Sequence, residues 1–161
     1  VQSALTGHLV LSTLHTNDSP TTITRLLEMG LEPYLVASAL LASMTQRLLR
    51  HVCPTCRETY LPPVEMLKEL GIEDAKTTRL ARGRGCKACH DSGYRGRLGV
   101  YELLESDDEL RALILGRPTL DALRAHLYKT TPATLRSEGF RKVCEGFTTI
   151  EEVKSVIGST N

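Results

Sequence analysis

The sequence contains no tryptophan, and aromatic residues make up only 4% of its 161 positions. Leu, Val, Ile and Ala must therefore supply most of the hydrophobic core. It also has no surplus of one charge, because 20 Lys and Arg stand against 19 Asp and Glu, for a net charge of +1. This balance argues against a nucleic-acid binder, which usually needs a basic surplus to neutralise phosphates.

No apolar stretch is long enough to span a bilayer. The longest covers residues 34–42, far below the roughly 20 residues that a spanning helix requires. The first residues, 1–7, contain no initiator Met and no signal-peptide pattern. We therefore expect a cytoplasmic chain cut from a longer protein, with no direct membrane span.

The length and composition indicate one folded domain, since 41% of the residues are hydrophobic and 24% are charged. No internal repeat or low-complexity segment interrupts it. The phosphate-binding pattern G-x-x-x-x-G-K-S/T is also missing. The chain alone therefore has no recognisable nucleotide-binding loop.

Four of the five cysteines form two C-x-x-C pairs, Cys53 with Cys56 and Cys86 with Cys89. A two-residue spacer lets both thiolates of a pair turn toward one point, and two such pairs supply the tetrahedral sulfur set that zinc favours. The sequence therefore predicts a zinc site on these four residues. The interval between the pairs is longer than in most zinc ribbons and has room for a short helix.

Other uses of the cysteines are less favoured. Disulfides fit poorly with an odd count and no secretion signal. A redox C-x-x-C fits poorly because two pairs are present and neither follows a clean strand. His51 or His90 could replace one thiolate, and Cys144 is expected to be a buried small hydrophobe.

Apolar spacing and capping residues predict a mixed α/β chain with a helical final part. The run at 9–14 reads as a buried strand, and Asp18 reads as the cap of a helix that stops at Gly30. Residues 46–52 fit either a strand or a helix, and 93–104 fit a turn followed by a strand. Capping boxes begin at Ser106 and Thr149. Further helices are expected at 35–41, 64–70, 120–128 and 135–145.

His8 and His15 lie at the two ends of the predicted strand at 9–14. Strand ends in α/β proteins are where ligands bind, because loops there bring donors into one crevice. A turn role for His8 and a buried, hydrogen-bonded His15 remain the simpler alternative. Arg25, Arg95 and Arg97 could bind anions, although isolated arginines are usually solvated or paired at the surface.

Residues 6–18, TGHLVLSTLHTND, resemble the histidine box of the secretion-superfamily ATPases that power type II secretion and type IV pilus assembly. Several further motifs follow in that family's order. The tetracysteine motif resembles the secretion and pilus-extension members rather than the retraction motors. The other matching stretches are 25–30 (RLLEMG), 46–48 (QRL), 93–97 (GYRGR), 134–136 (TLR), 145–146 (EG) and 149–153 (TIEEV).

The resemblance implies the C-terminal portion of a RecA-like P-loop ATPase domain with a tetracysteine zinc module and a helical C-terminal tail. It divides the chain into an ATPase-core part (1–52), the zinc module (53–92) and a return strand with a helical subdomain (93–161). Zinc would be bound by Cys53, Cys56, Cys86 and Cys89.

In the family, the histidine that corresponds to His15 lies near the terminal phosphate, and His8 corresponds to the other box histidine. Arginines that correspond to Arg25 and Arg97 support the activity of the assembled ring, where cations neutralise charge on the transferred phosphoryl group. The resemblance thus implies a homo-hexamer in the full-length parent, with inner-membrane platform proteins as partners and a cytoplasmic location at that membrane.

The family's Walker A loop, acidic box and Walker B segment precede the histidine box and are missing from these residues. ATP and magnesium would therefore be bound only by the full-length parent, and this chain alone is predicted to be inactive. The rival interpretation is a zinc-dependent module that binds protein or nucleic acid without ATP. A local run of basic residues favours it: Arg79, Arg82, Arg84, Lys87, Arg95 and Arg97.

Overall fold

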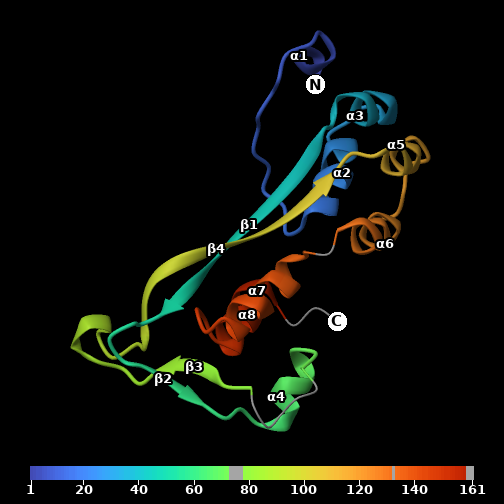
Figure 1. Ribbon diagram of the computed structural model, residues 1–161. Coiled ribbons are helices and arrows are strands. Elements are labelled where there is room, and N and C mark those ends of the chain that lie inside the picture. Colours follow the sequence, from blue (N-terminus) through green and yellow to red (C-terminus); the bar gives the residue numbers. More distant parts are fainter. Residues whose placement is uncertain (73–77, 132, 159–161) are drawn as a thin grey trace. The chain divides into compact units, whose positions relative to one another are not determined.

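The computed structural model describes residues 1–72, 78–131 and 133–158. These residues form a mixed α/β chain (Figure 1). The elements are α1 (Gln2–Leu5), α2 (Ser19–Glu28), α3 (Pro33–Ala39), β1 (Ala42–Val52), β2 (Arg57–Tyr60), α4 (Val64–Glu69), β3 (Leu80–Gly83), the 3-10 helix η1 (Lys87–Cys89), β4 (Tyr94–Glu105), α5 (Asp108–Leu115), α6 (Leu120–Thr130), α7 (Leu135–Cys144) and α8 (Ile150–Ile157).

The strands form two small sheets. Long strands β1 and β4 pair with each other, and β2 pairs antiparallel with β3, with Arg57 opposite Gly83 and Tyr60 opposite Leu80. The chain leaves β1 through the first cysteine pair and enters β4 at Tyr94, after the second pair and residues 90–93. Residues 53–93 are therefore an excursion between two neighbouring strands.

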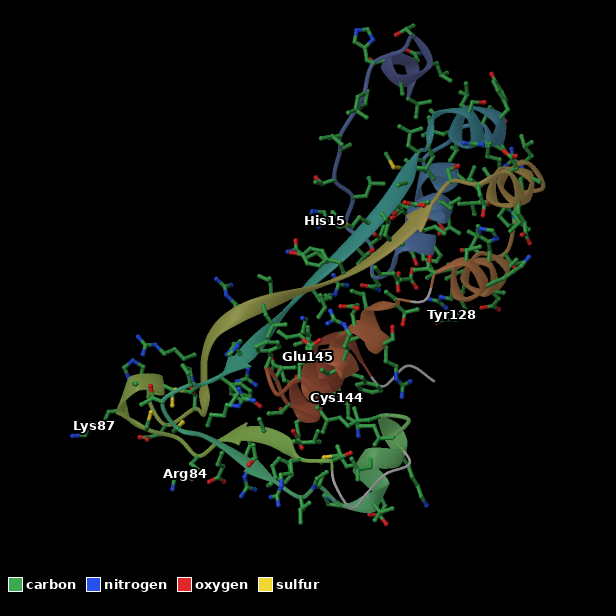
Figure 2. The ribbon with its side chains drawn as sticks, in the orientation of Figure 1. His15, Arg84, Lys87, Tyr128, Cys144 and Glu145 are labelled. Atoms are coloured by element: carbon green, nitrogen blue, oxygen red, sulfur yellow. The ribbon has the colours of Figure 1, made fainter. Side chains whose placement is uncertain are left out.

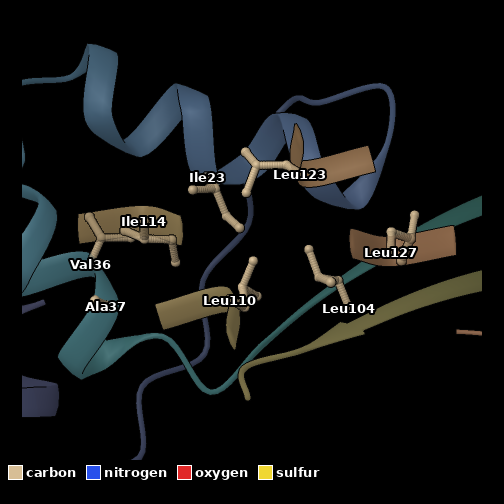
Figure 3. Close-up of a cluster of buried hydrophobic side chains, with 8 residues drawn as sticks. All are labelled: Ile23, Val36, Ala37, Leu104, Leu110, Ile114, Leu123 and Leu127. Atoms are coloured by element: carbon tan, nitrogen blue, oxygen red, sulfur yellow. The ribbon is translucent and has the colours of Figure 1, made fainter. Parts of the chain in front are cut away.

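The chain folds as two compact units, each built from two stretches of sequence. The first comprises Val1–Thr45 and Tyr101–Thr134. Helices α2, α3, α5 and α6 surround its core, to which β4 contributes one residue (Figure 3). The buried side chains are Ile23, Val36, Ala37, Leu104, Leu110, Ile114, Leu123 and Leu127.

The second unit comprises Gln46–Val100 and Leu135–Asn161. It contains the β2–β3 sheet, the cysteines of the two pairs and helices α7 and α8. Gly139 lets these helices approach closely, since a Cβ there would lie 2.9 Å from Cγ1 of Val153. The core residues are Leu49, Leu80, Val100, Leu135, Val143, Ile150 and Val153.

Most of the predicted elements are present. Asp18 caps α2, its side chain accepting a hydrogen bond from the Thr21 N–H, and the helix is followed by Gly30 with φ +87°. Residues 46–52 are the second half of strand β1. The helix expected at 35–41 ends at Ala39, because Leu40 has extended backbone angles.

The prediction of a strand at 9–14 is wrong. These residues have no regular secondary structure, and Leu9 and Leu11 are 77% and 88% exposed. A strand needs a neighbour to complete its hydrogen bonds. In the described parts of the chain, β1 and β4 pair only with each other, and residues 9–15 make no hydrogen bond.

Three local predictions also need correction. The cap of α5 is Asp107, not Ser106, because the Asp107 carboxylate accepts the Leu110 N–H at 2.7 Å. At α8, Thr149 caps as expected, but Glu152 hydrogen-bonds to Arg50 instead of completing the box. Cys144 is exposed, because α7 buries Leu135, Gly139 and Val143 on its other face.

Within the described residues, no helix has both the length and the apolar character needed to span a bilayer.

Candidate metal centre and histidine segment

The four paired cysteines come together at one point. Cys53 follows the last residue of β1, and Cys56 precedes β2. Cys86 is the N-cap of η1, and Cys89 is its last residue. Their four Sγ atoms all lie within 4.8 Å of one another. In Figure 2 the sulfur atoms gather near Lys87. We call these four residues the tetracysteine cluster.

The sulfur spacing fits a tetrahedral metal ion. Four sulfurs placed about 2.3 Å from a zinc ion at tetrahedral angles lie about 3.8 Å apart. The Sγ–Sγ distances are 4.0 Å for Cys53–Cys86, 3.9 Å for Cys56–Cys89 and 3.7 Å for Cys86–Cys89. All five cysteines are free thiols, which excludes a disulfide in this structure. The predicted ligand set therefore fits zinc in number, donor type and spacing.

The four thiols are shielded from solvent, and those of Cys56 and Cys89 differ in pKa. Cys53, Cys56 and Cys89 are buried, and Cys86 is partly buried. Burial raises the pKa of the Cys56 thiol to about 12. Burial also raises the pKa of Cys89, but hydrogen bonds from the backbone N–H groups of Cys86 and Gly93 outweigh it and lower that pKa to about 6. A divalent cation would ionise all four thiols.

The nearby histidines are not part of the cluster. The ligand atoms brought together are sulfurs only, among the residues that the structure describes. His51 Nδ1 lies 2.7 Å from the carbonyl oxygen of Val52, and its ring stacks at a tilt on Phe147. His90 is exposed and has a left-handed backbone with φ 51°. A histidine replacing one thiolate therefore has no support in the geometry.

Two glycines allow the chain to close around the cluster. A Cβ on Gly83 would lie 2.1 Å from the carbonyl oxygen of Gly93, and one on Gly93 would lie 2.6 Å from that of Gly83. The Cys53 N–H donates to the Gly93 carbonyl at 2.9 Å. Only residues without a side chain can bring the end of β3 this close to the start of β4. This contact was not predicted from the sequence, in which two glycines beside the second cysteine pair are its only signal.

Helix α8 is tied to the strand that leads into the cluster. Glu152 accepts the Arg50 backbone N–H at 2.9 Å and its Nε–H at 2.8 Å. Thr148 donates to the Arg50 carbonyl, and the Val52 N–H donates to the Phe147 carbonyl, both at 2.8 Å. Helix α8 and the segment before it are therefore bound to Arg50 and Val52, just before Cys53.

The histidine segment, residues 6–18, lies in the first unit and is exposed over most of its length. His8 is exposed and its Nδ1 lies 3.2 Å from the Ser3 carbonyl oxygen. His15 is exposed and has no hydrogen-bond partner among the described residues (Figure 2). The alternative of a buried, hydrogen-bonded His15 is therefore wrong for this structure.

The two candidate arginines are also exposed and are not joined to the histidines. Arg25 on α2 pairs with Glu28 at 3.3 Å. Arg97 on β4 belongs to the second unit. Within the described residues, no hydrogen bond or ion pair connects either arginine to His8 or His15. Their predicted joint role in a ring is therefore untested by this chain.

Comparison with known proteins identifies the family. The sequence profile described as "Type II/IV secretion system protein" matches residues 1–155. The chain belongs to this family. The family assignment made from the histidine box and the ordered motifs is thus confirmed.

Relatives in this family include the type II secretion system protein E of Pseudomonas aeruginosa, which is 47% identical over 97% of this chain and 31% of its own length. The type II secretion system ATPase E of Vibrio cholerae is 45% identical over 97% of this chain and 31% of its own length. The type IV pilus assembly ATPase PilB of Thermus thermophilus is 43% identical over 94% of this chain and 17% of its own length. The chain therefore spans a third or less of these relatives.

A solved structure supports the fold. The pilus retraction motor PilT with bound ADP has a TM-score of 0.60 at 20% identity, over 99% of this chain and 36% of that protein. At this identity the likeness speaks for the fold alone. The predicted fold class, a mixed α/β part of such an ATPase with a tetracysteine module, is confirmed.

Proposed function

We propose that this chain is the zinc-bearing segment of a hexameric ATPase that powers type II protein secretion or type IV pilus assembly. The observation that carries the proposal is the alignment of 97% of the chain with a type II secretion protein E at 47% identity. ATP and magnesium would bind to the parts of the full-length protein that this chain does not span. Inner-membrane platform proteins would be its partners, and it would work on the cytoplasmic side of that membrane.

The tetracysteine cluster would hold one structural zinc ion through Cys53, Cys56, Cys86 and Cys89. When bound, zinc supplies a cross-link between four thiolates, not a reactive centre, because a closed sulfur set leaves no open position. Here the cross-link would join the end of β1 to the start of β4. It would thereby hold the β2–β3 excursion in place.

The histidine segment would contribute His15, and with it His8, to nucleotide hydrolysis in the assembled ring. Arg25 and Arg97 would neutralise phosphate charge at subunit interfaces. The exposed apolar residues Leu9 and Leu11 support this proposal, because they would be buried once parts of the ring outside this chain covered them. The zinc-dependent nucleic-acid module is less favoured, since Arg82 and Arg84 both pair with Glu58.

A domain exchange tests the proposal. The matching segment of the Pseudomonas protein E is replaced by this chain, and ATP hydrolysis and secretion are measured. We expect both activities to be restored in the exchange protein, and the 161-residue chain alone to release no phosphate above background. A well-folded exchange protein without hydrolysis, or hydrolysis by the chain alone, would contradict the proposal. A salt-dependent shift of labelled nucleic acid would favour the alternative module.

A further inference from the structure

The start of helix α2 is held by a polar network that reaches three other elements of the first unit. The chain passes from exposed residues to buried ones within four positions, since His15 is exposed and Ser19 is fully buried. The network forms at this transition, directly after the histidine segment.

The first part of the network joins α2 to α6. Asp18 accepts two hydrogen bonds from Arg124, from Nε at 3.0 Å and from a terminal nitrogen at 2.8 Å. Its other oxygen accepts the Thr21 N–H at 2.9 Å. Burial raises the pKa of the Asp18 carboxyl, but its hydrogen bonds to Thr21 and Arg124 lower it below the ordinary value. The carboxylate is therefore ionised and fully partnered at neutral pH.

The second part joins α2 to both long strands. The Ser19 N–H donates to Oε1 of Glu102 at 3.0 Å, and its hydroxyl donates to the Glu102 carbonyl at 3.1 Å. The same hydroxyl lies 3.2 Å from Oγ1 of Thr45. Glu102 on β4 is only 5% exposed. A buried carboxylate is costly unless it is hydrogen-bonded, so its presence here fixes the geometry of these groups.

Residues 9–16 have little such support. Residues 9–15 make no hydrogen bond in the described chain, and Thr16 makes one, to Thr22 at 3.1 Å. The network therefore anchors the chain at the point where the histidine segment enters α2. Arg124 and Glu102, which lie 106 and 83 residues from their partners, are its long-range contacts.

We infer that Arg124 and Glu102 are positioning residues for His15. They act through Asp18 and Ser19 and touch no substrate. The importance of His15 for hydrolysis rests on the proposed function, whereas the positioning itself can be measured without nucleotide. Failure of the inference is therefore distinguishable from failure of the proposed function.

The test measures backbone order by NMR relaxation at residues 15–17 in the 161-residue chain. Arg124→Gln removes the charged group that donates two hydrogen bonds to Asp18, and Arg124→Lys keeps one charged donor. Glu102→Leu leaves the Ser19 N–H without an acceptor, and Glu102→Gln retains one. Arg117→Gln is the matched control, because Arg117 pairs at the surface with Glu32. Val36→Ala, in the core of the same unit, controls for lost stability alone.

We expect the order parameters at 15–17 to fall from about 0.85 to below about 0.6 in Arg124→Gln and Glu102→Leu. Arg124→Lys and Glu102→Gln should restore most of the order, and both controls should leave it unchanged. Hydrogen exchange of the Ser19 amide should accelerate about ten-fold or more in Glu102→Leu only. Unchanged order in both disruptive variants, or an equal loss in Val36→Ala, would overturn the inference.

Discussion

The carboxylate of Glu152 binds both the backbone and the guanidinium of Arg50, 102 positions earlier in the chain. Glu152 is almost completely buried, and Arg50 also lies over the ring of Tyr94, with its Cζ 4.2 Å from the ring centroid. This contact connects helix α8 to the end of β1, three residues before the tetracysteine cluster. Helix α8 is thus part of the structure that supports the metal centre.

Glu152→Gln should destabilise the chain by about 1.5 kcal/mol at pH 7, because a charged hydrogen-bond partner is lost from a buried site. Burial raises the pKa of the Glu152 carboxyl, but hydrogen bonds from Arg50 lower it below the ordinary glutamate value. The carboxylate's stabilising contribution is therefore present above about pH 4.3 and is lost as the pH falls through the lowered value.

The difference in unfolding free energy between the wild type and Glu152→Gln should accordingly shrink in acid. Denaturant unfolding at pH 7 and pH 3 measures it. Glu145→Gln is the control, because Glu145 forms surface pairs with Arg141 and Lys142, and should change stability by less than about 0.5 kcal/mol. An equal loss of unfolding free energy in Glu152→Gln at pH 7 and pH 3 would contradict this role of the ionised carboxylate.

Gly83→Ala should distort the metal centre, because its Cβ would lie 2.1 Å from the Gly93 carbonyl oxygen and one of the two backbones must move. We expect a loss of about 3 kcal/mol or more and weaker zinc retention. Competition with a chromogenic chelator measures the retention. Gly116→Ala, whose Cβ would meet nothing closer than 3.4 Å, should leave zinc binding unchanged. Wild-type retention in Gly83→Ala would show that the close approach is not required.

The two candidate caps of α5 can be separated by single substitutions. Asp107→Ala should cost about 1 kcal/mol, because the carboxylate accepts the Leu110 N–H. Ser106→Ala should be neutral or slightly stabilising, since the buried Ser106 hydroxyl has no partner among the described residues. Thermal unfolding of both variants measures the difference. The reverse order of stability would favour the cap predicted from the sequence.

Substitution of any one tetracysteine residue by Ser should reduce bound zinc from one ion per chain to a small fraction. Tetrahedral coordination of zinc needs a thiolate at each of its four positions, and a serine hydroxyl binds zinc poorly. Cys144→Ser is the internal control, because Cys144 is exposed on α7 and lies outside the cluster. Loss of zinc in Cys144→Ser, or full retention in the other four, would argue against the ligand set.

Local signals in the sequence predicted local structure well. Asp18 and Thr149 cap the helices expected of them, because a cap depends on residues only two or three positions away. The spacing of the cysteines predicted the turn within each pair for the same reason, and the preference of a metal ion for four sulfurs predicted that the two pairs meet. The family motifs predicted the fold class.

The features that failed or were missed depend on distant parts of the chain. The apolar run at 9–14 has the pattern of a strand but no neighbouring strand in the described residues. The partners Arg50 and Glu152, or Asp18 and Arg124, lie more than 100 positions apart, and nothing local marks them as a pair. The three-part division at 53 and 93 and the roles of His15, Arg25 and Arg97 remain predictions.

The most direct test of the metal centre is zinc X-ray absorption on freshly purified, reduced protein, combined with metal analysis. We expect one zinc ion per chain with four sulfur neighbours at about 2.3 Å and no directly bound nitrogen or oxygen. A chain without zinc, or a shell that contains histidine nitrogen, would contradict it.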